Sequence, residues 1–149
     1  MSKHPPAFIA IDRDDAYAKY VGRTADRKQF FLTKPYLAAG PGEPEHDFLC
    51  LYIFDEDGVL IDAQIEDLGS RDQVDVEQAR TIRALMLESL GKYSPGRILV
   101  VPFRVERFGV EFGLIAHPPK RLTDDWRVTV EPGHYMTFSP PWDGGSYEP

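Results

Sequence analysis

Carboxylates are the side chains of this sequence that are best placed to do chemistry, because they gather in two short stretches. Three follow one another directly at Asp55, Glu56 and Asp57. Two more, Asp62 and Glu66, come a few positions later. Paired carboxylates can act as acid and base in hydrolysis, whereas a field of uncompensated carboxylates attracts basic partners. The same residues therefore support two hypotheses, one of catalysis and one of binding.

The catalytic hypothesis depends on a strand that carries the second stretch. Apolar and polar residues alternate over residues 59–66, so Asp62 and Glu66 share one face, on which neighbouring side chains lie about 7 Å apart. If a loop covered this face, the domain would bind a small molecule or hydrolyse it, with His117 or His134 completing a pocket between sheet and helix. Alternation does not distinguish a covered face from an exposed one, and a solvent-facing strand is the simpler interpretation.

The other residues with reactive side chains form no recognisable site. His46 lies close to Glu43, Glu45 and Asp47, but this loop contains two prolines and lacks the fixed ligand spacing of a metal site. The single cysteine, Cys50, lies in the most apolar segment and should behave as a small hydrophobic residue. We therefore expect no metal, no cofactor and no disulfide framework.

The charge of the chain is concentrated in its middle third. The net charge is -7, yet residues 37–78 alone carry -11, against +3 for residues 1–36 and +1 for residues 79–149. These acids either form a solvated surface that keeps the protein soluble or provide a docking face for a basic partner. In the second case Asp55, Glu56, Asp57, Asp62 and Glu66 form the partner-binding face.

Basic and aromatic residues are interleaved in the N-terminal third, a pattern found where single-stranded nucleic acid is bound. The residues concerned are Tyr17, Lys19, Tyr20, Arg23, Arg27, Lys28, Phe30, Phe31, Lys34 and Tyr36. The chain as a whole is acidic, and half of these aromatic side chains are needed for a core. We therefore expect no nucleic-acid partner.

Alternating apolar residues and turn signals predict strands before and after a single helix. The expected strands are Tyr17–Thr24, Gln29–Lys34, Phe48–Phe54, Val59–Glu66, Ile98–Arg107, Val110–His117, Trp126–Val130 and Tyr135–Phe138. Tight hairpins imply antiparallel pairing. The predicted fold is α+β: one curved antiparallel sheet of about seven to eight strands built from hairpins, with one amphipathic helix packed on it.

The helix is expected at residues 75–90, with Asp72 or Asp75 as its cap and Gly91 at its end. Its predicted buried stripe consists of Val76, Ala79, Ile82, Leu85, Met86 and Leu90. We predict one domain over residues 1–149, with irregular tails at residues 1–6 and 139–149. No apolar run reaches the roughly 18 residues of a membrane span, and no signal peptide is apparent, so we expect a cytoplasmic protein without a membrane partner.

These observations favour a non-catalytic domain that binds another, basic protein through its acidic face and neutralises or regulates it. In size and charge such a domain resembles small immunity proteins, which present clustered carboxylates to basic toxins. The alternative remains a small-molecule-binding domain or hydrolase that uses the carboxylates of the sheet face.

Overall fold

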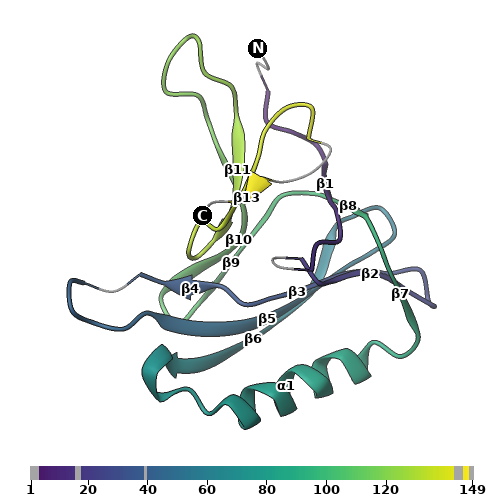
Figure 1. Cartoon of the computed structure of the whole chain (residues 1–149). Helices are drawn as coiled ribbons and strands as arrows, with labels where there is room; N and C mark the ends of the chain where they lie inside the picture. The colour runs from purple at the N-terminus through teal and green to yellow at the C-terminus, as the bar shows by residue number, and fades with distance from the viewer. Residues whose placement is uncertain (1–3, 16–17, 39, 143–145, 148–149) are drawn as a thin grey trace.

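A computed structural model describes residues 4–15, 18–38, 40–142 and 146–147 of the chain (Figure 1). These residues form an α+β fold of thirteen strands, one α-helix and one short 3-10 helix. The strands pair antiparallel in three sheets of six, five and two strands. The predicted class is confirmed, but the prediction of one sheet of about seven to eight strands is wrong.

The six-stranded sheet is built around β5, which has neighbours along both edges. Its strands are β2 (Tyr20–Thr24), β3 (Gln29–Thr33), β4 (Tyr36–Leu37), β5 (His46–Phe54), β6 (Leu60–Ser70) and β7 (Tyr93–Pro95). Cys50 of β5 lies between Thr33 of β3 and Ile65 of β6. Since β6 has no other strand beside it in the described part of the chain, it forms one border of the sheet.

The second half of the chain forms the other two sheets. The five-stranded sheet contains β9 (Phe103–Arg107), β10 (Val110–His117), β11 (Arg127–Glu131), β12 (Met136–Phe138) and β13 (Ser146–Tyr147), and the small sheet pairs β1 (Ile9–Ile11) with β8 (Ile98–Val100).

Two sequence predictions about this half need correction. The predicted strand Ile98–Arg107 divides into β8 and β9 at Val101 and Pro102 and so enters two different sheets. Proline has no N–H group to donate to a ladder, which explains why the strand is interrupted there. The tail at residues 139–149, predicted to be irregular, contributes β13, which pairs with β12.

The main core lies between the six-stranded and five-stranded sheets. Side chains alternate along β5, so Phe48 and Tyr52 point towards the five-stranded sheet, where Phe48 meets Phe112 edge to face at 5.0 Å between ring centroids. Leu49 and Leu51 point to the opposite face, which α1 covers. Because both faces of β5 are buried, the continuous apolar run at residues 48–54 is explained.

The register of β6 differs from its predicted alternation. Ala63 and Ile65 pack against the main core as expected, but Val59 and Ile61 are 49% and 51% exposed. A register shift inserts Ile61 as an extra residue, so that Leu60, opposite Phe54, takes the inward position instead. A β-bulge of this kind reverses the alternation, and periodicity alone gives no sign of it.

A buried glutamine connects the hairpin between β5 and β6 to β8. The Gln29 side chain is 1% exposed, and its Nε2 donates to the carbonyl oxygens of Asp55 at 3.3 Å and Leu99 at 2.9 Å. Its Oε1 accepts the N–H of Leu99 at 2.8 Å. The hairpin approaches β8 so closely that a Cβ on Gly58, whose φ is 86°, would lie 2.5 Å from the Leu99 carbonyl oxygen.

The helix α1 (Val76–Ser89) follows the 3-10 helix η1 (Arg71–Gln73) and lies along the outer face of the six-stranded sheet (Figure 1). Asp75 caps α1 by accepting the N–H groups of Glu77 and Gln78, which confirms the predicted start. No helix in the described part of the chain is long and apolar enough to cross a membrane.

The predicted apolar stripe of the helix is only partly buried. Met86 is 5% exposed and packs with Ile82 and Leu90, whereas Val76 and Leu85 are 63% and 60% exposed. Successive residues of a helix are turned by about 100°, so Leu85 cannot face the sheet together with its neighbour Met86. The prediction that both are core residues is wrong for Leu85.

This difference gives a matched pair of substitutions. Met86→Ala should lower the free energy of unfolding by about 2–5 kcal/mol, because it empties a buried site. Leu85→Ala should lower it by less than about 1 kcal/mol, since the side chain is mostly in solvent. Both variants introduce alanine, the residue of highest helix propensity, so helix propensity does not account for a difference between them. Urea denaturation measures both values, and equal losses would contradict the packing of α1.

The role of Gln29 is tested by Gln29→Met, which keeps the size of the side chain but removes its hydrogen-bonding groups. We expect the free energy of unfolding to fall by roughly 2–4 kcal/mol, because the backbone groups of Leu99 and Asp55 lose their partner in a buried place. Gln78→Met on the exposed face of α1 is the control and should change stability by less than about 0.5 kcal/mol. If Gln29→Met left the free energy of unfolding unchanged, the hairpin and β8 would have to be held together by other contacts.

Candidate functional site

The three hairpin acids do not have equivalent roles. Oδ1 of Asp55 accepts the backbone N–H groups of Asp57 and Val59, each at 2.9 Å, so this carboxylate shapes the turn between β5 and β6. Glu56 and Asp57 lie exposed at the tip. Asp55 is thus a structural acceptor, and only the other two present their charge freely to solvent.

Asp62 and Glu66 lie on β6, opposite Ile53 and Leu49 of β5, and therefore on the helix side of the sheet. Both are exposed, and Asp62 accepts a hydrogen bond from Gln64 at 3.3 Å. They are four residues apart along the strand, or roughly 13 Å, which exceeds the separation of paired carboxylates in glycoside hydrolysis. This arrangement does not support the hydrolase hypothesis.

Together these acids form a ridge. Glu56 and Asp57 lie at the hairpin tip, and Asp62 and Glu66 follow on β6, roughly 13 Å apart. We call Glu56, Asp57, Asp62 and Glu66 the acidic border. None of the four has a cationic side chain within 4.0 Å among the residues that the structure describes.

The acids around His46 have different neighbours. Arg71 binds Asp47 through Nη2 at 2.9 Å and through Nε at 3.1 Å, and it also binds Glu45. Asp47 is 1% exposed, so the guanidinium balances a buried charge. His46 pairs with Asp67. No group of three or more His, Cys, Asp or Glu side chains in the described residues could hold a metal ion.

The two histidines considered for a pocket belong to one hydrogen-bonded chain. The hydroxyl of buried Thr129 donates to Glu131 at 2.6 Å, and it therefore accepts from Nε2 of His117 at 2.7 Å. Glu131 in turn lies 3.1 Å from Nδ1 of His134, and the two imidazole rings are 6.4 Å apart. His117 lines a pocket of about 500 Å³ together with Trp126 and residues of the loop before it.

These histidines are separated from the sheet-face carboxylates. His117 lies on β10 and His134 lies between β11 and β12, in the five-stranded sheet. Asp62 and Glu66 lie on the face of the six-stranded sheet that is turned away from it. The structure therefore brings His117 and His134 together but does not bring them to Asp62 or Glu66.

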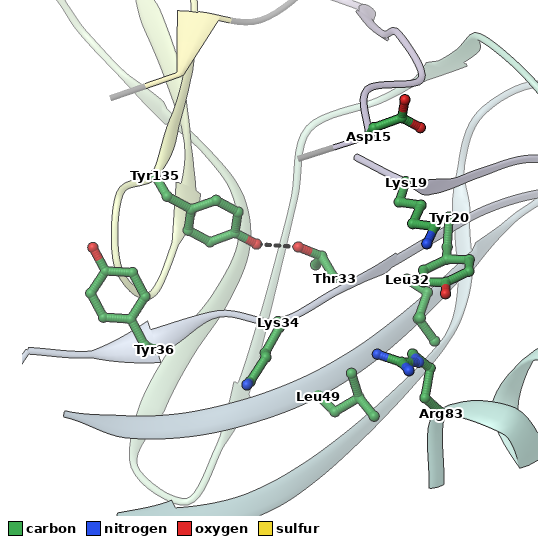
Figure 2. Close-up of a pocket in the computed structure, with 10 residues that line it drawn as sticks. All are labelled: Asp15, Lys19, Tyr20, Leu32, Thr33, Lys34, Tyr36, Leu49, Arg83 and Tyr135. Atoms are coloured by element: carbon green, nitrogen blue, oxygen red, sulfur yellow. Dashed lines mark hydrogen bonds between the residues drawn. The ribbon is translucent and has the colours of Figure 1, made fainter. Parts of the chain in front are cut away.

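The described residues also form a pocket that the sequence did not predict (Figure 2). It has a volume of about 380 Å³ and is bordered by three cationic side chains from three parts of the chain: Lys19 before β2, Lys34 after β3, and Arg83 on α1. Tyr135, from the segment before β12, contributes to the wall. We call this the cationic pocket.

Only part of the cationic pocket has a signal in the sequence. Lys19, Tyr20, Lys34 and Tyr36 belong to the interleaved basic and aromatic pattern of the N-terminal third. Arg83 is on a helix, Tyr135 comes from a distant strand pair, and no spacing rule connects them. Only the packing of α1 and the five-stranded sheet around the end of β3 brings these groups together.

Burial suppresses ionisation of the groups in the core. It raises the pKa of the Cys50 thiol to about 12. Burial also raises the pKa of Tyr135, whose hydroxyl is bonded to Thr33. Cys50 is thus an unreactive core residue, as expected from its apolar strand.

Comparison of the chain with models of protein families, with curated proteins and with solved structures found no match. Its function must therefore be inferred from the geometry of its own residues.

The environment of His117 predicts a pH dependence of stability. Desolvation lowers its pKa, the charges of Arg127 and His134 lower it further, and Glu131 and Glu111 oppose the shift. A histidine with a lowered pKa in the folded state is more easily protonated when unfolded. Its contribution to stability is therefore present above the ordinary pKa of about 6.5 and is lost as the pH falls through the lowered value.

His117→Gln keeps a donor for Thr129 but cannot be protonated. The difference in unfolding free energy between wild type and this variant should therefore become less favourable to wild type as the pH falls from about 8 to 5. Denaturant titrations of both proteins at each pH measure this difference. A difference that stays constant, or grows towards acid, would contradict the lowered pKa.

Proposed function

We propose that the chain is a non-catalytic binding domain that docks on a basic protein along β6 and thereby neutralises or regulates that partner. The observation that carries this proposal is that β6, an edge strand of eleven residues, carries Asp62 and Glu66, which have no cationic side chain within 4.0 Å among the described residues. The backbone and the side chains of the same strand each contribute to recognition.

The backbone of β6 offers a template for one more strand. Along the outer side of an edge strand, alternate residues leave their N–H and C=O groups unpaired. The pairing of β6 with β5 is regular from Asp62 to Asp67, and register shifts bracket this run of six residues. Six residues are enough for an extended segment of a partner to add to the sheet, a recurrent mode of peptide recognition.

The acidic border selects the charge of the partner. Glu56, Asp57, Asp62 and Glu66 are not neutralised by described neighbours, in contrast to Asp47, which is held by Arg71. Their field should accelerate the approach of a basic segment, and salt should weaken this effect. The same charges oppose pairing of β6 with the β6 of a second copy, because like charges would face each other.

Apolar contacts complete the proposed surface. Val59 and Ile61 are 49% and 51% exposed beside Asp57 and Asp62. Exposed aliphatic side chains of this kind can bury the apolar positions of a partner segment. The preferred partner segment is therefore extended and combines Lys or Arg with aliphatic residues.

This proposal is tested with a labelled 12-residue peptide of alternating lysine and valine, and with a glutamate–valine peptide as the opposite charge. Fluorescence anisotropy at low salt should show binding of the lysine peptide only. Asp62→Asn/Glu66→Gln should weaken this binding about tenfold, because two facing charges are lost. Amide exchange should slow at residues 62–67 in the complex, as strand addition requires.

Glu88→Gln/Glu106→Gln is the matched control, since it removes two exposed charges from α1 and β9. It should retain the affinity of wild type within about twofold. Equal weakening by both pairs would mean that only net charge attracts the peptide, and the acids would then be a solubility coat. Absence of binding by the lysine peptide would also refute docking along β6.

A further inference from the structure

We propose that the cationic pocket binds a small organic anion that combines a carboxylate or phosphate head group with an apolar or aromatic body. Arg83 and Lys19 hold the head group, and Leu32 and Leu49 contact the body. This site has different lining residues from the acidic border, although Glu66 of the border lies opposite Leu49 of the pocket wall. It does not depend on the function proposed for β6.

The charges around the pocket call for an anion. Lys19 and Arg83 both lie over the ring of Tyr20, with Nζ and Cζ at 5.5 and 5.7 Å from its centroid (Figure 2). Neither has a carboxylate within 4.0 Å among the described residues, and Asp15, which also lines the pocket, is bound to Arg13 at 3.0 Å. Both cations therefore add to the positive potential around Tyr20, which attracts an anion to this side of the pocket.

The third cation is already engaged and provides a contrast. Nζ of Lys34 lies 3.7 Å from Asp47, the buried carboxylate that Arg71 also binds. Lys34 therefore contributes positive potential to the pocket, but its ammonium group is already paired with Asp47 and is not assigned as a ligand of the head group. The head group is accordingly assigned to the side near α1, where Arg83 offers a planar fork that suits carboxylates and phosphates alike.

The remaining surface of the pocket suits an apolar body. Leu32 and Leu49 are only 3% and 5% exposed and belong to the small core beneath α1. Tyr36 and Tyr135 stack at 6.3 Å between centroids and form an aromatic wall. The hydroxyl of Tyr135 is bonded to Thr33, which fixes the orientation of this ring (Figure 2).

The size of the pocket limits the ligand. Its volume of about 380 Å³ lies within the range of roughly 300–1,000 Å³ that is usual for small-molecule sites. A molecule of one aromatic ring with one anionic group fits this space. A nucleic-acid strand does not suit it, because the net charge of -7 repels a polyanion beyond the pocket.

The test is a ¹H–¹⁵N correlation titration of the full chain with four probes: phenyl phosphate, benzoate, inorganic phosphate and benzyl alcohol. At least one of the two aromatic anions should bind about tenfold more tightly than benzyl alcohol and inorganic phosphate, with shifts at Tyr20, Leu32 and Arg83. Whether phenyl phosphate or benzoate binds more tightly identifies the head group. Binding of inorganic phosphate as tight as that of both aromatic anions would refute the apolar subsite.

Arg83→Gln and Lys19→Gln should each weaken binding of the preferred anion about tenfold. Arg80→Gln, one turn earlier on α1 and paired with Glu77, is the matched control and should leave affinity within about twofold. The melting temperature of each variant shows that the fold is retained. Equal effects of Arg83→Gln and Arg80→Gln, or no preference for anions over benzyl alcohol, would overturn the proposal.

The two proposals can fail separately. Asp62→Asn, which changes the acid of the border that lies opposite Ile53 and away from the pocket wall, should weaken binding of the lysine–valine peptide but leave the affinity for phenyl phosphate and benzoate unchanged. Loss of anion binding in this variant would show that the pocket does not act as an independent site.

Discussion

The burial of β5 on both faces is the constraint on which the rest of the structure depends. A strand with aromatic side chains on one face and leucines on the other must be covered twice. The five-stranded sheet covers the face that carries Phe48 and Tyr52, and α1 covers the face that carries Leu49 and Leu51.

Such close packing leaves few places for polar groups inside. Most of those present are bonded, but the buried hydroxyl of Tyr52 has no hydrogen-bond partner among the described residues. Gln29 satisfies backbone groups of the hairpin and of β8, and Asp47 is neutralised by Arg71 and Lys34. Substitution of Gln29 or of Arg71 would leave a buried backbone group or a buried charge without a partner. The loss of stability would then exceed the contribution of the hydrogen bond or ion pair itself. These interactions fix how the layers meet and thereby the position of β6 and of the pocket.

The charges of the chain are separated in space in a way that its net value conceals. The acidic border follows the outer edge of the six-stranded sheet, and the cationic groups of the pocket gather near the end of β3 and on α1, with Leu49 of the pocket wall next to Glu66 of the border. Attraction of a basic segment to the first site and of a small anion to the second are therefore compatible in one protein. The net charge of -7 alone would predict attraction of a basic segment and exclude binding of a small anion.

The sequence by itself determined the class of fold, the buried strand at residues 48–54, the hairpin after it and the start of α1, because periodicity and capping act over a few residues. It also located the acids, but their arrangement along an edge needed the topology. Tertiary structure alone decided the reversal at Ile61, the exposure of Leu85 and the assembly of Lys19, Arg83 and Tyr135. Each depends on contacts between residues far apart in the chain, for which local patterns contain no signal.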